Sequence, residues 1–139
     1  MTPRQSVEAE CRRRGRQAVI AGCVDLIAGR EADDALIVAL GGPPAEYVLS
    51  GREGGRTGYW PRVWGTRGLL HVWDDLATPA VAEATGDQAW RVREMACKVV
   101  ARHKVGDALG AVVALLDDPV PRVRRSAERA VEVLTASLA

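Results

Sequence analysis

The sequence predicts an all-α protein built from stacked helical repeats. The first reason is internal similarity: when the chain is shifted along itself by 31 residues, part of its second half matches the next part without a gap. The identical pairs are Ala80 and Ala111, Val81 and Val112, Asp87 and Asp118, Arg91 and Arg122, Val92 and Val123, Arg93 and Arg124, Ala96 and Ala127, and Val100 and Val131. A self-match at a period of this length is typical of a stacked repeat architecture.

Two further observations favour helices. Apolar residues make up 47% of the chain, but aromatic residues make up only 4%, and Phe is absent. Small side chains, mainly Ala, Val and Leu, must therefore fill the core, which suits closely packed helices better than a β-sandwich. Apolar residues also recur at helical spacing, most clearly over residues 88–103 and 121–137.

The N-terminal half contains two expected helices, over residues 17–29 and 31–40. Residues 1–16 are mostly polar and basic, whereas residues 17–29 are rich in apolar side chains and end at a glycine, which indicates a mostly buried helix. Acidic residues at the start of 31–40 complement the helix dipole, and the Gly-Gly-Pro-Pro sequence after it ends the helix. We expect one more helical turn over 45–50 and a flexible, glycine-rich loop over 51–58.

The C-terminal half alternates shorter and longer helices. A proline in the first turn suits a helix over residues 61–73. Short helices over 77–85 and 107–116 each lead into a turn that contains aspartate. Each of these turns is followed by a longer amphipathic helix, over 88–103 and over 121–137, with apolar residues on one face and charged residues elsewhere.

Residues 86–96 (GDQAWRVREMA) and 117–127 (DDPVPRVRRSA) resemble HEAT repeats. In that family, an Asp in the turn between repeats and an Arg near the start of the following helix form a ladder along the stack. The residues that match this ladder are Asp87, Arg93, Asp118 and Arg124. The resemblance covers residues 75–134, and it extends to 60–73, where Trp64 replaces the second Arg of the motif.

The resemblance implies an armadillo-like α-solenoid, a right-handed superhelix of about three to four stacked hairpins that form one domain over residues 1–139. One hairpin cannot bury its apolar face alone, so its neighbours in the stack complete the core. The stack would present a concave surface, made by the shorter helices and the turns, to a ligand. We therefore expect a non-enzymatic scaffold whose partner is a protein.

The bulk composition places limits on the function. The chain has 139 residues with 19 basic and 18 acidic side chains, so its net charge of +1 lacks the positive excess of many nucleic-acid-binding proteins. It contains no apolar run of about 18 residues and begins with polar residues, so we expect neither a membrane span nor a secretory leader. The 3 cysteines, without metal-ligand spacing, indicate free thiols in a cytoplasmic protein.

The 4 tryptophans provide candidate binding residues. Trp60 and Trp64 are four positions apart, so they share one face of a helix. With nearby arginines, such rings can anchor a partner protein or stack on a base. The predicted set is Trp60, Arg62, Trp64, Trp73, Trp90 and Arg91. The alternative interpretation is that these large side chains fill a core otherwise made of small residues.

Nucleic-acid binding is the alternative function. Arginines cluster in residues 12–16 and 122–129, where they either contact phosphates or form solvated helix faces. HEAT-like DNA alkylpurine glycosylases hold damaged DNA with tryptophans, an aspartate and arginines, but this chain is short for that family and does not reproduce its motif order. The residues of suitable type are Trp73, Asp74, Trp90 and Arg91. HEAT-like bilin lyase subunits share the repeat, yet no residue here points to pigment handling.

No set of residues has the spacing of a catalytic or metal site. Segment 51–57 is one residue short of a phosphate-binding loop, has Arg in place of Lys, and lacks an alternating pattern of strands and helices. Asp74 and Asp75 suit helix capping. His71 and His103 end their helices, where a cation is favoured, and have no second ligand at metal spacing. We therefore expect no catalytic residue, metal or cofactor, while the oligomeric state stays open.

Overall fold

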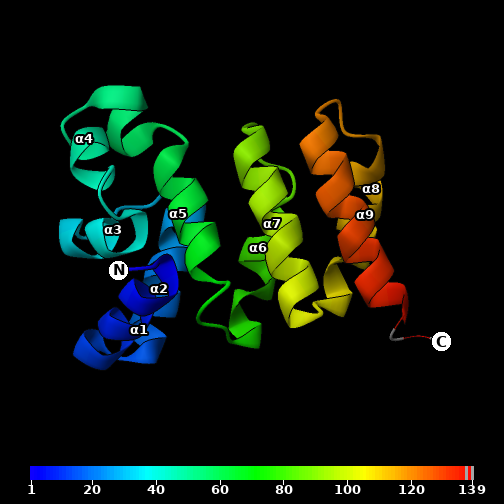
Figure 1. Ribbon diagram of the computed structural model, residues 1–139, viewed down its shortest axis with the longest axis horizontal. Coiled ribbons are helices and arrows are strands. Elements are labelled where there is room, and N and C mark those ends of the chain that lie inside the picture. Colours follow the sequence, from blue (N-terminus) through cyan, green and yellow to red (C-terminus); the bar gives the residue numbers. More distant parts are fainter. Residues whose placement is uncertain (137, 139) are drawn as a thin grey trace. The chain divides into compact units, whose positions relative to one another are not determined.

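The computed structural model describes all residues except 137 and 139, and the regular elements in the described part are helical (Figure 1). The chain divides into two compact units, Met1–Asp74 and Asp75–Ala139. None of the described helices is both long enough and apolar enough to cross a lipid bilayer. The last helix was predicted to end at residue 137 and the single domain at residue 139, and both of these residues lie outside the described part. The single domain stays a prediction.

Polar side chains cap the N-termini of two helices in the first unit. Its elements are α1 (Pro3–Arg14), α2 (Arg16–Ile27), α3 (Asp34–Gly41), α4 (Ala45–Leu49), a 3-10 turn (Arg52–Thr57) and α5 (Trp60–Gly68). Thr2 and Gln5 form a capping box at the start of α1, in which each side chain accepts a hydrogen bond from the other residue's backbone N–H. Asp33 caps α3 by accepting a hydrogen bond from the N–H of Leu36 at 2.8 Å.

Helix α5 packs directly on α2 in the core of this unit. Gly65 and Gly68 make the close approach possible: a Cβ on Gly65 would lie 2.8 Å from Leu26 Cβ, and a Cβ on Gly68 would lie 2.8 Å from Cys23 Sγ. Helices α1 and α3 pack beside this pair. The buried apolar side chains include Val19, Ile20, Leu26, Ile27, Leu36, Ile37, Leu40, Val48, Val63, Trp64 and Leu69. Helix α5 is therefore held on several sides, and it carries three of the predicted site residues.

In the later part of the first unit, α5 and the segment 51–58 differ from the sequence prediction. Helix α5 ends at Gly68 instead of near Trp73. The N–H groups of Leu69 and Leu70 each bond to the carbonyl three residues earlier, at 3.1 and 2.9 Å, which tightens the chain into turns. Leu69 is nevertheless fully buried, so the apolar pattern continues past the end of the helix. The predicted loop over 51–58 contains a 3-10 turn that is interrupted by left-handed backbone.

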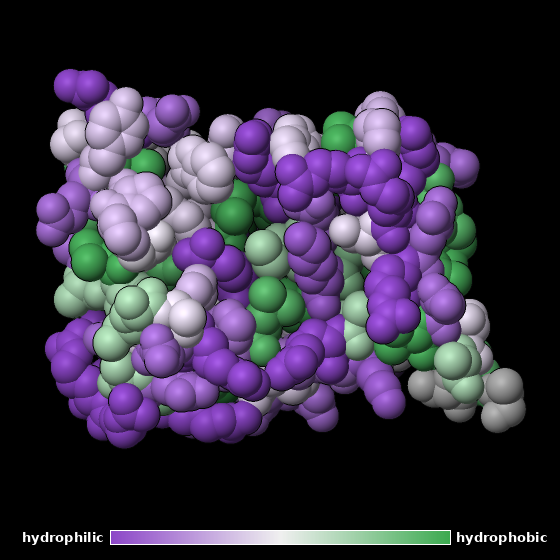
Figure 2. Space-filling model, viewed as in Figure 1, coloured by the Kyte–Doolittle hydropathy of each residue, from purple (hydrophilic) through white to green (hydrophobic). Residues whose placement is uncertain are grey.

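The second unit alternates short and long helices. Its elements are a 3-10 turn (Asp75–Ala77), α6 (Thr78–Ala84), α7 (Trp90–His103), a 3-10 turn (Gly106–Ala108), α8 (Leu109–Ala114), a 3-10 turn (Leu115–Asp117) and α9 (Pro121–Ala136). The long helices α7 and α9 lie side by side, with α6 against α7 and α8 against α9 (Figure 1). On the face of this unit seen in Figure 2, hydrophilic side chains run along α9.

Residues 31 positions apart occupy similar environments in the second unit. Three matched pairs have side chains that are fully buried in both copies: Val81 and Val112, Val92 and Val123, and Ala96 and Ala127. The last matched pair differs, because Val100 is fully buried whereas Val131 is half-buried. Each copy therefore buries the same stripe of small apolar side chains between its helices.

Candidate functional site

The turn before α9 is built around the carboxylate of Asp118, which is 6% exposed. Arg93 of α7 binds it through two nitrogens, Nε to Oδ2 at 2.7 Å and Nη2 to Oδ1 at 3.2 Å. The backbone N–H of Val120 donates to Oδ1 at 2.9 Å. Burial alone would raise the pKa of Asp118, but hydrogen bonds from Arg93 and Val120 and the charges of Arg93 and Arg124 outweigh burial and hold the pKa below its usual value. Asp118 is therefore ionised at neutral pH and ties α7 to the start of α9.

The turn before α7 repeats this geometry 31 residues earlier. Asp87 Oδ1 accepts a hydrogen bond from the N–H of Ala89 at 2.8 Å, two residues on, as Asp118 does in the later turn. Arg93 Nη1 donates to the backbone carbonyl of Asp87 at 2.9 Å, and Arg124 Nη1 donates to that of Asp118 at 2.7 Å. Asp87 and Asp118 of the predicted ladder therefore lie in two equivalent turns, each bonded by an arginine of the following helix, and Arg93 contacts both turns.

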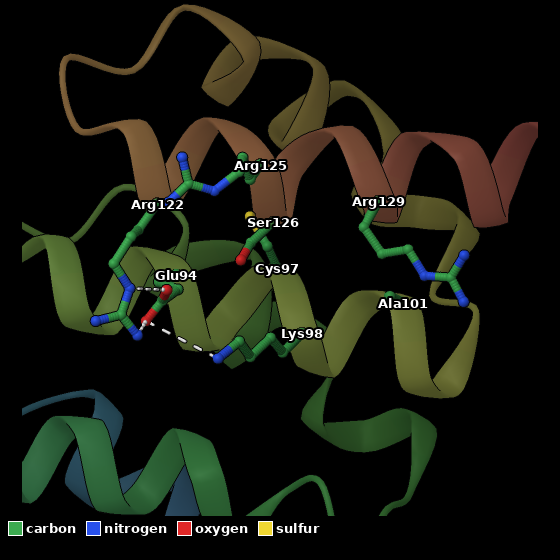
Figure 3. A pocket seen from close by; sticks show the side chains of 8 residues that line it. All are labelled: Glu94, Cys97, Lys98, Ala101, Arg122, Arg125, Ser126 and Arg129. Carbon is green, nitrogen blue, oxygen red and sulfur yellow. Dashed lines mark hydrogen bonds and ion pairs between the residues drawn. The ribbon is translucent and has the colours of Figure 1, made fainter.

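A groove of about 250 Å³ lies between α7 and α9 (Figure 3). Small side chains form its floor: Cys97 is fully buried, and Ala101 and Ser126 are half-buried. The basic residues around it are Lys98, Arg122, Arg125 and Arg129. The groove therefore combines a floor of small side chains with a strongly positive rim.

One acidic residue, Glu94, also lines the groove and is 8% exposed. Its carboxylate accepts hydrogen bonds from Arg122 Nε at 2.9 Å and Arg122 Nη2 at 3.2 Å, and Lys98 Nζ lies 3.9 Å away. Figure 3 shows Glu94 between these two basic side chains. The side chains of Arg125 and Arg129, in contrast, make no hydrogen bond or ion pair with any other residue that the structure describes. The rim therefore retains two guanidinium groups without a carboxylate partner, about one helical turn apart along α9.

Trp90, at the start of α7, lies next to two guanidinium groups. Its ring centroid is 4.4 Å from Arg91 Cζ and 5.2 Å from Arg122 Cζ. Both distances allow cation–π interactions. Trp90 and Arg91 belong to the predicted binding set, but Arg122 does not. The match between Arg91 and Arg122 in the two repeats is the signal that would have found it.

The remaining predicted binding residues lie in the first unit. Trp60 and Trp64 stack with ring centroids 6.1 Å apart and an interplanar angle of 25°. Trp64 is 2% exposed, so its ring belongs to the core, whereas Trp60 is half-buried. Arg62 Nη1 donates to a backbone carbonyl one turn earlier at 3.2 Å, and the carbonyl of Trp73 accepts a hydrogen bond from Arg16. The predicted set therefore consists of two groups, one in each unit.

The described residues include no group of three or more His, Cys, Asp or Glu side chains that could hold a metal ion. Burial, with smaller contributions from Asp118 and Glu94, raises the pKa of Cys97 to about 12. Burial likewise raises the pKa of Cys23 to about 12, with a smaller effect of Cys11. Because a thiol needs to be deprotonated to act as a nucleophile, Cys97 and Cys23 are inert at neutral pH.

Comparison with known proteins adds no assignment. The chain matches no protein-family model, no curated protein and no solved structure. Its own geometry defines an all-helical protein whose second unit carries a basic groove between two parallel copies of one sequence motif.

Proposed function

We propose that the chain is a small, non-enzymatic HEAT-like repeat protein, an α-solenoid of about three to four helical hairpins, which binds an acidic segment of a partner protein. The repeat is supported by matched geometry at a spacing of 31 residues. Val92 and Val123 are both fully buried, and Asp87 and Asp118 cap equivalent turns with bonds of 2.8 and 2.9 Å. A fold of this kind supplies a rigid helical surface and needs no catalytic group.

The observation that carries the binding function is the groove between α7 and α9. Arg125 and Arg129 lie on its rim without a partner carboxylate among the described residues. Arginine and tryptophan are the side chains most enriched among residues that dominate protein interfaces, and the ring of Trp90 lies 5.2 Å from the guanidinium of Arg122, which belongs to the rim. An acidic segment laid in the groove would complete the charge pairs that the protein itself leaves open.

The shape and charge of the groove favour a protein partner over a nucleic acid. The small side chains of the floor, Cys97, Ala101 and Ser126, suit contact with apolar atoms of a peptide. Glu94 already pairs with Arg122 and Lys98, so the groove offers less free positive charge than a run of phosphates would use. The net charge of +1 also provides little of the long-range attraction that nucleic-acid binding uses.

This proposal places the binding surface differently from the sequence prediction, which favoured the shorter helices and the turns. The unpaired guanidinium groups belong to α9, one of the two long helices, and the remaining lining comes from α7 and α9. The arginines of residues 122–129, which the sequence left open as phosphate contacts or solvated helix faces, line the groove because α7 and α9 lie against each other.

Charge reversal tests the proposal. Partners captured at physiological salt are identified and purified, and their affinity is measured for the wild type and for the double variant Arg125→Glu, Arg129→Glu. The matched control is Arg12→Glu, Arg102→Glu, which changes the net charge equally at two exposed arginines outside the groove. We expect the groove variant to lose at least about tenfold in affinity and the control to lose little.

Two results would contradict the proposal. One is a partner that binds the groove variant as tightly as it binds the control. The other is saturable binding of duplex DNA or RNA at physiological salt, abolished by the groove variant, which would assign the groove to the alternative function, nucleic-acid binding.

A further inference from the structure

A second cavity, in the first unit, is lined by aromatic rings and one arginine. It has a volume of about 330 Å³ and lies among α3, α4, the 3-10 turn and α5. Its lining includes Gly41, Tyr47, Glu53, Trp60, Trp64 and Arg67. This volume falls at the lower end of the range found for small-molecule sites, and the mixture of aromatic walls with few polar groups is typical of such sites.

The aromatic wall is fixed in shape by its packing. Trp64 is held in the core and stacks on Trp60, which therefore has a supported ring. Gly41 contributes to this arrangement, because a Cβ there would lie 2.7 Å from the Trp64 ring. Tyr47 is 51% exposed, and the guanidinium of Arg52 lies 5.4 Å from its ring centroid. Side chains of intermediate hydropathy form a pale patch over α4 and the start of α5 in Figure 2.

Arg67 supplies the positive charge of the cavity. One of its nitrogens, Nη2, donates to the carbonyl of Leu40 at 2.6 Å. No carboxylate in the described part of the chain pairs with it, and its pKa is lowered because the group is partly removed from water. A guanidinium carries five N–H donors in a planar fork, so donors remain for a ligand. Such a fork matches the two oxygens of a carboxylate.

Glu53 restricts the kind of anion that can enter. Glu53 lines the same cavity and lies in a turn. Its backbone φ of 54° is in the left-handed region that favours glycine. Backbone of this kind is uncommon for a residue with a side chain and is concentrated at ligand sites. The negative charge of Glu53 opposes a second negative charge on a ligand, so a monoanion is favoured over a phosphate dianion.

We propose that this cavity binds an organic monocarboxylate with a planar apolar body. The carboxylate would pair with Arg67, and the apolar body would lie against Trp60 and Tyr47. This inference is independent of the function proposed for the α7–α9 groove. The same chemistry is present in a free aromatic acid and in the C-terminal residue of a peptide that ends in Phe, and the experiment compares these two sources.

The test follows the tryptophan indole N–H signals by nuclear magnetic resonance, with each signal assigned by a Trp→Phe variant. The probes are 3-phenylpropionate and Gly-Gly-Phe, each compared with its uncharged amide at up to about 10 mM. We expect the acid form of at least one probe to shift the Trp60 signal saturably, with at least about tenfold weaker binding of the amide. The stronger of the two acids identifies the source.

Variants separate the two charges of the cavity. Arg67→Met should weaken binding at least about tenfold, and Arg67→Lys should weaken it less, because a lysine keeps the charge but loses the planar fork. Glu53→Gln should strengthen binding by a few-fold, since it removes a like charge. The matched control is Arg4→Met, an exposed arginine of α1 outside the cavity, with no expected effect.

The inference is overturned if the amides bind as tightly as the acids, or if neither acid shifts the Trp60 signal. It is also overturned if a folded Arg67→Met variant, checked by its thermal unfolding, retains wild-type affinity. If Arg67→Met fails to fold, two other results decide the question. One is the comparison of acid and amide on the wild type. The other is whether Arg67→Lys weakens binding while Glu53→Gln strengthens it.

Discussion

Asp118 provides the sharpest stability prediction, because its carboxylate serves two elements at once. In Asp118→Ala, the start of α9 loses the bond from Val120 N–H, and loss of such a cap costs about 1 kcal/mol. Arg93, whose side chain is 14% exposed, also loses its counter-charge. Breaking a fully buried pair costs about 3–5 kcal/mol, but Arg93 keeps its bonds to the carbonyls of Asp87 and Gln88, so we expect less than this. The free energy of unfolding should fall by about 3 kcal/mol in total.

The assay is urea denaturation followed by far-ultraviolet circular dichroism, with Asp117→Ala as the matched control. Asp117 is the adjacent, exposed aspartate, so its removal changes the net charge equally and should change the free energy of unfolding by less than about 0.5 kcal/mol. A loss for Asp118→Ala no greater than that of the control would refute the reasoning.

The pH dependence of this difference follows from the lowered pKa of Asp118. A carboxyl with a lowered folded-state pKa contributes stability that is fully present above its unfolded pKa and is lost as the pH falls through its folded pKa. The difference between wild type and Asp118→Ala should therefore be constant near neutral pH and shrink below about pH 4. A difference that instead grows on acidification would contradict the assignment of Asp118 as an ionised partner of Arg93.

Two further predictions concern thiols and close packing. In the native protein, a thiol reagent should modify Cys11, which is half-buried, well before Cys23 and Cys97, which are fully buried; simultaneous reaction of all three would show that the core is open. Gly41→Ala should lower the free energy of unfolding by about 1–3 kcal/mol, because the new Cβ lies 2.7 Å from an indole ring. The control Gly110→Ala should not be destabilised, because no atom lies within 4 Å of its new Cβ. Equal thermal unfolding of these two variants would contradict the packing described for the first unit.

The long helices of the second unit were predictable because each has one face in a core and one face in water. Helix α7 was expected over 88–103 and runs over Trp90–His103, so only its start differs. In the first unit, the apolar pattern was less informative because it reports burial and not conformation, as the fully buried turn residue Leu69 shows. The sequence prediction gave helix α1 no bounds, although the capping pair Thr2 and Gln5 marks its start.

The candidate sites were predictable only in part. The repeat match explains why Arg91 and Arg122 reach the same ring of Trp90 from two helices. The groove itself depends on the pairing of α7 with α9, which places Glu94 and Lys98 next to arginines that are distant in sequence. The cavity beside Arg67 likewise arises from the fold of the preceding turns, so neither site could be derived from local spacing.

The proposed repeat requires that the second unit contains two copies of one helical motif with a shared core. The most direct test truncates two fully buried valines that lie 31 positions apart, Val92 and Val123. The free energy of unfolding is measured for Val92→Ala and Val123→Ala and compared with that of Val113→Ala, where the valine side chain is 44% exposed. We predict losses of about 2 kcal/mol for each buried valine, equal within about 0.5 kcal/mol, and little loss for the exposed control. If either buried variant is as stable as the control while the other is strongly destabilised, the two positions are not equivalent and the repeat is contradicted.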